Sequence, residues 1–218
     1  MHSYLDKIGK RFRFDWIYRR VDYHFAPGGR YAVLGPNGSG KSTLLRALCG
    51  HLTPTEGTVR WEHAGRQIAR DDIFRHVAYA APYVELMEEL TLTELLDFQR
   101  RFVDFHPALP DTAALIDRME LRPARRREVR FFSSGMKQRV KLALAVCSRR
   151  PLLILDEPTT NLDAAATQWY LDLVREFGAD RTIVVASNVP TDYSFCDRSL
   201  NILDYKPVPK RRRAPKTS

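Results

Sequence analysis

Short apolar runs alternate with a glycine loop and helix-like segments along this chain. Residues 30–34 form an apolar run that ends at Gly35, and residues 42–50 then place leucines at helical spacing. Residues 152–155 and 182–186 are unbroken apolar runs of strand length. Because parallel strands are covered on both faces, such runs indicate a buried parallel sheet. The pattern predicts an α/β core that opens with strand, glycine loop and helix.

Residues 85–150, between these strands, have the composition and spacing of helices. We expect Thr93 to cap a helical segment over 93–102, and Pro151 to close the region. One apolar stripe precedes that proline: Met136, Val140, Ala143, Leu144 and Cys147. The chain is thus expected to be one domain over 1–204, with a helical lobe at 85–150 inserted into a core at 1–84 and 151–204.

The composition limits the class of protein. With 218 residues and 44% hydrophobic side chains, the chain can bury a core and is not a disordered tail protein. No run approaches the roughly 20 apolar residues that a membrane span requires, and the N-terminus lacks the apolar segment of a signal peptide. Three separated cysteines form no disulfide framework or zinc pattern. A soluble protein of the reducing cytoplasm is the expectation.

The net charge of +9 is concentrated at the C-terminus. Residues 205–218 hold six of the basic side chains and no acidic one, which leaves residues 1–204 with 29 basic and 26 acidic groups. This proline-rich segment has no apolar periodicity and is expected to be a disordered tail. Three roles stay open for it: solvation, contact with anionic lipid headgroups, or contact with RNA.

The strongest chemical signal follows the first predicted strand. The motif GxxxxGK[ST] is complete in Gly35, Pro36, Asn37, Gly38, Ser39, Gly40, Lys41, Ser42 and Thr43. Glycines let backbone N–H groups wrap around phosphate oxygens, Lys41 adds a fixed positive charge, and Ser42 offers a hydroxyl to Mg²⁺. By average residue usage the motif arises by chance in about one chain of this length in a hundred. It predicts a P-loop that binds ATP.

An acidic pair ends the apolar run at 152–155. Asp156 and Glu157 follow that strand directly, at the edge of the sheet where α/β proteins hold ligands. We expect Asp156 to hold Mg²⁺, through its water shell, and Glu157 to poise a water molecule as general base for attack on the γ-phosphate.

A third segment indicates the family. Residues 132–140 open a helix that runs into the acidic strand, and Ser133, Ser134 and Gly135 resemble the signature segment of ATP-binding-cassette (ABC) ATPases. The resemblance covers residues 4–204, and residues 161–163 look like the D-loop of that family. It implies a P-loop NTPase core with a parallel sheet, an N-terminal antiparallel β region and an inserted helical subdomain.

The resemblance also implies roles and partners. Phe12 becomes the aromatic that stacks on adenine, with Phe14 and Trp16 as competitors. Two chains are expected to pair head to tail, so that Ser133, Ser134 and Gly135 complete the partner's ATP site, and the start of a helix does favour phosphate. The second cassette can be identical or different.

The implied function is the ATP-binding and ATP-hydrolysing subunit of an ABC transporter, peripheral at the inner face of the cell membrane. It would work with separate transmembrane subunits, received in a groove formed by the helical lobe and residues 82–89. One alternative is a soluble cassette that acts on ribosomes or nucleic acid, and the single P-loop argues against it. Another is a regulatory cassette with low turnover.

Two positions depart from the family pattern. The glutamine expected after residues 77–79 is missing, so Tyr83 or Glu85 must contact the metal or its water, or no residue does. The histidine expected after the strand at 182–186 is replaced by Asn188, which can donate a neutral hydrogen bond to the γ-phosphate but carries no charge. Asn188 is therefore expected to be a modified catalytic sensor.

Overall fold

The computed structural model describes residues 1–207, so most of the expected basic tail lies outside the described residues. The strands are β1 (His2–Phe12), β2 (Asp15–Phe25), β3 (Arg30–Leu34), β4 (Glu56–His63), β5 (Arg66–Ile68), β6 (Val77–Ala80), β7 (Leu152–Asp156), β8 (Thr182–Ala186) and β9 (Arg198–Asn201). The α-helices are α1 (Lys41–Leu48), α2 (Leu92–Gln99), α3 (Thr112–Arg118), α4 (Ser134–Val146) and α5 (Ala164–Phe177). Single 3-10 segments are η1 (Arg70–Arg75), η2 (Arg122–Ala124), η3 (Val129–Phe131), η4 (Pro190–Tyr193) and η5 (Ile202–Tyr205).

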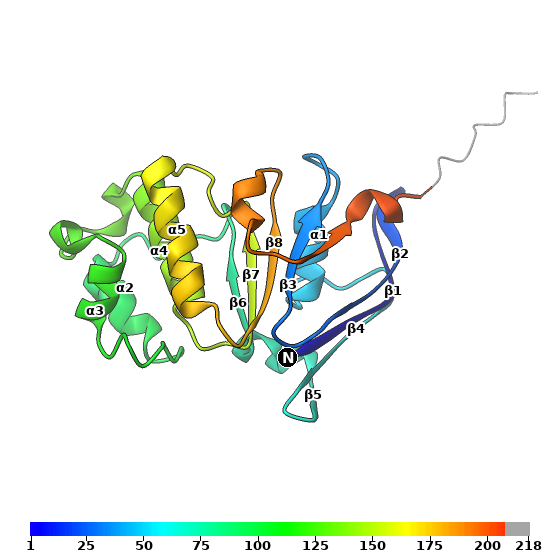
Figure 1. Cartoon of the computed structure of the whole chain (residues 1–218), viewed down its shortest axis with the longest axis horizontal. Coiled ribbons are helices and arrows are strands. Elements are labelled where there is room, and N and C mark those ends of the chain that lie inside the picture. The colour runs from blue at the N-terminus through cyan, green and yellow to red at the C-terminus, as the bar shows by residue number, and fades with distance from the viewer. Residues whose placement is uncertain (208–218) are drawn as a thin grey trace, which may run out of the picture.

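The strands form two sheets of opposite character. One is antiparallel, in the order β2-β1-β4-β5, and the other is parallel, in the order β6-β7-β8-β3-β9. Helix α1 lies between the two sheets, while α4 and α5 cover the other face of the parallel sheet and α2 and α3 lie beyond them (Figure 1). The expected P-loop core, N-terminal antiparallel region and helical lobe are confirmed.

The sequence of β7 does not alternate between apolar and polar residues, because both faces of the strand are buried. Leu153 and Leu155 pack into the cluster that includes α4 and α5, whereas Leu152 and Ile154 pack into the cluster that includes α1 and the antiparallel sheet. All four side chains are fully buried. Each face of the strand therefore contributes to a different hydrophobic core, as the two faces of the neighbouring β8 also do.

The helical lobe differs from its prediction at one cap. Thr91, rather than Thr93, is the N-cap of α2, because its side chain accepts from the Glu94 backbone N–H while Glu94 accepts from the Thr91 backbone. Thr93 instead donates to the Arg125 carbonyl and ties the helix to the next loop. The capping box has the same Thr-x-x-Glu spacing that a sequence search can find. The stripe on α4 lies in the lobe's core as predicted.

Strand order brings three loops to one edge of the parallel sheet. β8 lies between β7 and β3, with Asp156 paired to Ala186 and Val33 paired to Ala186 in register. The segments that follow these three strands therefore begin side by side. Among residues 1–207, no helix has the length and apolar character needed to cross a membrane.

Candidate nucleotide site

The loop between β3 and α1 takes a path that only glycine permits at two positions. Gly35 and Gly40 have φ angles of 145° and 107°. A Cβ atom on Gly40 would lie 2.4 Å from the Cγ2 atom of Ile17, and one on Gly35 would lie 2.6 Å from that of Ile202. The turn delivers the chain into α1, whose first backbone N–H groups have no partner within the helix.

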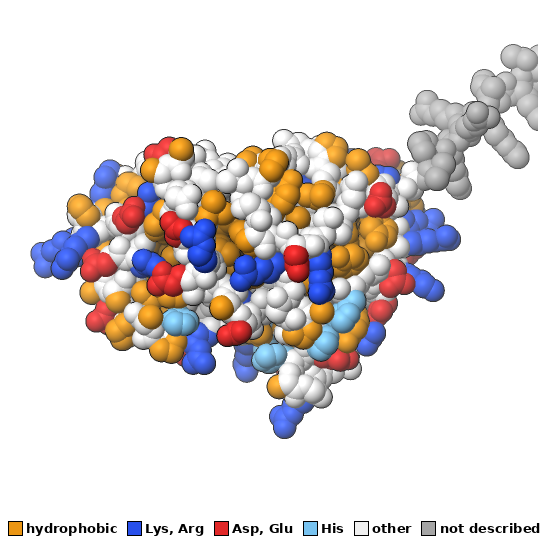
Figure 2. Space-filling view, in the orientation of Figure 1, with side chains coloured by type: hydrophobic (Ala, Val, Ile, Leu, Met, Phe, Trp, Pro, Cys, Tyr) orange, Lys and Arg blue, Asp and Glu red, His pale blue; other side chains and the backbone are white. Residues whose placement is uncertain are grey.

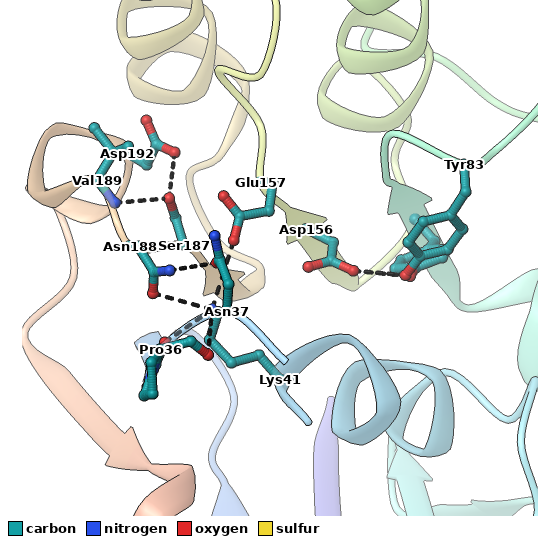
Figure 3. A network of polar contacts seen from close by, with 12 residues as sticks. Pro36, Asn37, Lys41, Tyr83, Asp156, Glu157, Ser187, Asn188, Val189 and Asp192 are labelled. Atoms are coloured by element: carbon teal, nitrogen blue, oxygen red, sulfur yellow. Dashed lines mark hydrogen bonds and ion pairs between the residues drawn. The ribbon is translucent and has the colours of Figure 1, made fainter. Parts of the chain in front are cut away.

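The ammonium group of Lys41 is the centre of this site. The side chain is only 5% exposed, and its Nζ donates to the Gly35 carbonyl at 2.8 Å and to Asn188 Oδ1 at 3.0 Å. Glu157 Oε1 lies 3.6 Å from the same nitrogen. Figure 3 shows these groups converging on Lys41 from separate segments. The carboxylate and the amide thus stand where a phosphate bound by this lysine would meet them.

Asn188 makes a second contact with the loop. Its amide nitrogen donates to Asn37 Oδ1, while its oxygen accepts from Lys41 (Figure 3). The residue follows β8 and is itself exposed. A neutral side chain therefore connects the turn after β8 to Asn37 within the glycine loop and to Lys41 at the start of α1.

An open cavity of about 460 Å³ lies over the loop. Its lining consists of Ile17, Asn37, Gly38, Ser39, Gly40, Lys41, Ser42, Thr43, Glu157 and Thr160. Seven of the predicted P-loop residues and Glu157 therefore share one space. Phe12 is not among the lining residues: it ends β1, is 49% exposed, and has the Lys10 ammonium 5.0 Å from its ring. The two competing aromatics, Phe14 and Trp16, are not in the lining either.

Asp156 is fully buried beneath this space and is bound by two tyrosines. Its Oδ2 accepts from the Tyr83 hydroxyl at 2.5 Å and from the Tyr79 hydroxyl at 3.5 Å. Its other oxygen, Oδ1, has no hydrogen-bond partner among residues 1–207. Burial, together with the bond to Asp156, raises the pKa of Tyr83, which keeps it a hydroxyl donor.

Tyr83 and Glu85, the two candidates to replace the missing glutamine, lie in different surroundings. Tyr83 reaches Asp156, whereas Glu85 lines a different cavity together with Lys141. Sequence reasoning missed Tyr79 and Arg46, whose guanidinium lies 4.1 Å from the Tyr83 ring centre. It also missed Ile17 and Thr160, because neither residue type marks a nucleotide site.

Glu157 has an unusual backbone and a perturbed carboxyl group. Its φ is 48°, and its backbone N–H donates to the Ala186 carbonyl of β8 at 2.8 Å. Burial raises the pKa of its carboxyl group, and the nearby Lys41 charge only partly offsets this effect. A carboxylate with a raised pKa is a better proton acceptor than an ordinary surface glutamate.

The segment 133–135 lies outside this cavity. Ser133 caps α4 by accepting from the Met136 backbone N–H at 3.2 Å, and both serines are exposed. Gly135 faces the Asn161 carbonyl, which a Cβ atom would approach to 3.1 Å. Within one chain, therefore, these residues do not join the P-loop cavity.

Known proteins are similar to this chain in both sequence and fold. A model of the ABC transporter family matches residues 18–160. The cytochrome c biogenesis ATP-binding export protein CcmA of Brucella abortus is 35% identical over 175 residues, which cover 80% of this chain and 79% of the relative. The daunorubicin/doxorubicin resistance ATP-binding protein DrrA of Streptomyces peucetius is 36% identical over 157 residues, or 71% of this chain and 48% of that protein.

Solved structures of ABC ATP-binding proteins have a similar fold. The ATP-binding subunit of an ABC transporter superposes with a TM-score of 0.79 at 25% identity, covering 92% of this chain and 85% of the other. A dimeric ATP-binding cassette in a post-hydrolysis state with ADP and phosphate gives 0.77 at 20% identity, covering 91% and 93%. The chain belongs to the ABC transporter family. It is an ATP-binding subunit, an ATPase that powers transport.

The raised pKa of Glu157 gives a pH prediction. Because the folded state binds this proton more tightly than the unfolded state, the ionised carboxyl group lowers stability above its folded pKa. That cost vanishes as the pH falls below the ordinary value of 4.5. Without nucleotide, Glu157→Gln should raise the thermal midpoint at pH 7.5 by less than about 4 °C, the shift that 1 kcal/mol gives at this size.

The difference should disappear near pH 4, as measured by calorimetric unfolding of both proteins. Glu89→Gln, on an exposed loop, is the control and should shift nothing at either pH. A lower midpoint for Glu157→Gln at pH 7.5 would show that the Lys41 contact outweighs the cost of burial.

Proposed function

We propose that the cavity over the P-loop binds the phosphates of ATP and that the chain hydrolyses ATP at the interface of a head-to-tail pair. The observation that carries the assignment is the convergence of Glu157 and Asn188 on the buried Lys41 ammonium. The phosphate-binding set from one chain is Gly35, Pro36, Asn37, Gly38, Ser39, Gly40, Lys41, Ser42 and Thr43. Ser133, Ser134 and Gly135 of the second cassette complete the site, and Phe12 stays the predicted adenine contact.

The residues present fit a magnesium ion. Asp156 is fully buried, and one of its oxygens has no hydrogen-bond partner within the described range 1–207; a buried carboxylate oxygen in that condition favours a cation. We propose that Asp156 and the Ser42 hydroxyl hold Mg²⁺, which when bound neutralises phosphate charge. Tyr83 keeps the other oxygen of Asp156 oriented through its hydroxyl.

Glu157 and Asn188 then divide the chemistry. Glu157 accepts the proton of the attacking water, a role that its raised pKa favours. The Asn188 amide donates to the γ-phosphate as charge develops on the phosphate oxygens, in place of its bond to Asn37. Because an amide carries no charge, we expect turnover below that of a cassette with histidine at this position.

A groove beside the helical lobe is the proposed seat of the membrane subunit. Two adjoining cavities share Val103 and Arg150, and the lining of one includes Val84, Glu85 and Leu86 of the segment that carries Tyr83. Exposed Phe74 and Phe102 form an apolar rim. A cytoplasmic helix with apolar and acidic side chains fits this rim, which also carries Arg75 and Arg149.

The names of two relatives bear on the direction of transport. CcmA is by name an export protein and DrrA a resistance protein, and we propose that this chain also energises export. The site of action is the cytoplasmic face of the membrane. The ribosome and nucleic-acid alternative is not favoured, because the family match is to transporters.

The first test removes the central charge. Lys41→Ala should weaken MgATP binding at least about tenfold, since a lost charged hydrogen bond costs about 1.5–3 kcal/mol, while the apolar core keeps the chain folded. Titration calorimetry measures the affinity, and circular dichroism checks the fold. Lys7→Ala, on the exposed part of β1, is the matched control. Equal affinity in the Lys41 variant and the wild type would refute the P-loop assignment.

The second test separates Tyr83 from Glu85. Tyr83→Phe removes the hydroxyl donor from Asp156 and leaves that carboxylate more dependent on a cation. The ratio of ATP affinities with Mg²⁺ and with EDTA should therefore rise about tenfold, the worth of one hydrogen bond to a charged group. Glu85→Gln should leave the ratio unchanged. An unchanged ratio in Tyr83→Phe together with a changed one in Glu85→Gln would reverse the assignment.

The third test concerns the groove. When the tagged chain is purified from solubilised membranes, a multi-span membrane protein should co-purify with it. Phe102→Asp should reduce that recovery several-fold, because it puts a charge on the apolar rim. Leu203→Asp, which also changes an exposed apolar residue but lies on η5, is the control. Equal recovery with both variants would place the membrane partner elsewhere.

The basic tail suggests a contact with anionic lipid. The Lys206 ammonium donates to the Ile17 carbonyl at 2.8 Å, so the last described residues lie beside the β1–β2 hairpin, whose tip carries the 91% exposed Phe14. Figure 2 shows Lys and Arg side chains gathered next to this point. We propose that the hairpin tip and the tail together bind lipid headgroups, at up to about 1 kcal/mol per basic residue.

Flotation with vesicles tests the lipid contact. The full chain should float with vesicles that contain phosphatidylserine and not with phosphatidylcholine alone, and binding should weaken as salt rises. A chain that ends at Tyr205 should lose most of this binding. Equal flotation of both chains would exclude the tail as the lipid contact.

A further inference from the structure

Asp192 is a buried carboxylate outside the predicted site. It lies on η4, is 1% exposed, and accepts two hydroxyl hydrogen bonds, from Thr159 Oγ1 to Oδ1 and from Ser187 Oγ to Oδ2, each at 2.6 Å. Its backbone carbonyl accepts from the Tyr170 hydroxyl at 2.8 Å, which fixes η4 on the buried face of α5. Such a fully paired carboxylate holds its partners in a defined geometry.

The two hydroxyl donors belong to the loops that carry the proposed catalytic groups. Thr159 lies two residues after Glu157, and Ser187 immediately precedes Asn188. The Ser187 oxygen also accepts from the Val189 backbone N–H at 3.0 Å, so the turn is held on both sides of Asn188. In Figure 3 the contacts of Ser187 with Asp192 and Val189 lie above Asn188, on the side away from Lys41.

The same loop after β7 also contacts α4. Gln138 is buried and its Nε2 donates to the Pro158 carbonyl at 2.7 Å, while Gly135 packs against the Asn161 carbonyl. Residues 158–161 are therefore held in place by α4 on one side and by Asp192 on the other.

We propose that Asp192 is a positioning residue for hydrolysis, an inference that rests on the proposed function. By bonding Thr159 and Ser187 at once, it fixes the loop after β7 against the turn after β8. Glu157 and Asn188 are thereby both held facing the phosphate position at Lys41. Removing this bridge loosens two catalytic groups together and leaves the P-loop itself intact.

Replacing the carboxylate with an amide tests the proposal. Asp192→Asn keeps the size of the side chain but makes one of the two hydroxyls lose its acceptor. We expect kcat for ATP to fall about ten- to hundredfold, as small misplacements of catalytic groups do, while the dissociation constant for MgATP changes less than about threefold. Thr159→Val, which removes one donor, should show a smaller loss of the same kind. Asp172→Asn, an exposed carboxylate on α5, should change neither quantity.

A double-mutant cycle with Asn188→Ala shows whether Asp192 acts through the catalytic groups. If it does, the loss of kcat in the double variant is clearly smaller than the product of the two single losses. Losses that multiply, or an unchanged kcat in folded Asp192→Asn or Thr159→Val, would overturn the proposal. Failure of the wild type itself to bind MgATP would instead reject the proposed function.

Discussion

The buried ammonium of Lys41 is the interaction on which the arrangement of this site depends. A lysine that is 5% exposed needs oxygen partners, and here they come from three places: the carbonyls of the glycine loop, the amide of Asn188 and the carboxylate of Glu157. These groups meet because β8 lies between β7 and β3 in the parallel sheet, so the three strands end side by side. The order of strands thus produces the local chemistry.

Tyr83 connects Asp156, the proposed magnesium ligand, to the helical lobe. A phenol reaches Asp156 from a segment whose next residues line the groove at the lobe, and Lys141 of α4 donates to the Pro82 carbonyl beside it. The segment is therefore anchored to the acidic strand at one end and to α4 at the other. A partner that moves Val84 or Leu86 would act on Asp156 through one hydrogen bond.

The parts of the site that the sequence predicts are those with local patterns. The glycine loop, the acidic end of β7 and the unbroken apolar strands each follow from residues adjacent in the chain, and the family resemblance rests on the same segments. The placement of Tyr83 on Asp156 joins residues 73 positions apart, which no local pattern encodes. Asp192 and Ile17 carry no motif, and their roles depend on packing between distant elements. Thr91 and Thr93 both resemble caps, but only Thr91 has a glutamate three residues later, so the capping-box spacing could have separated them.

In the proposed head-to-tail pair, ATP joins two cassettes, with the P-loop of one facing Ser134 of the other, and the simplest such pair is two copies of this chain. Glu157→Gln should halt hydrolysis and preserve the bound γ-phosphate. Static light scattering of this variant with MgATP therefore measures directly whether two chains pair. If two copies pair, the molar mass of this variant doubles with MgATP, and adding Lys41→Ala or Ser134→Arg restores the single-chain mass. A Glu157→Gln chain that binds MgATP and keeps its single-chain mass at high concentration would contradict it.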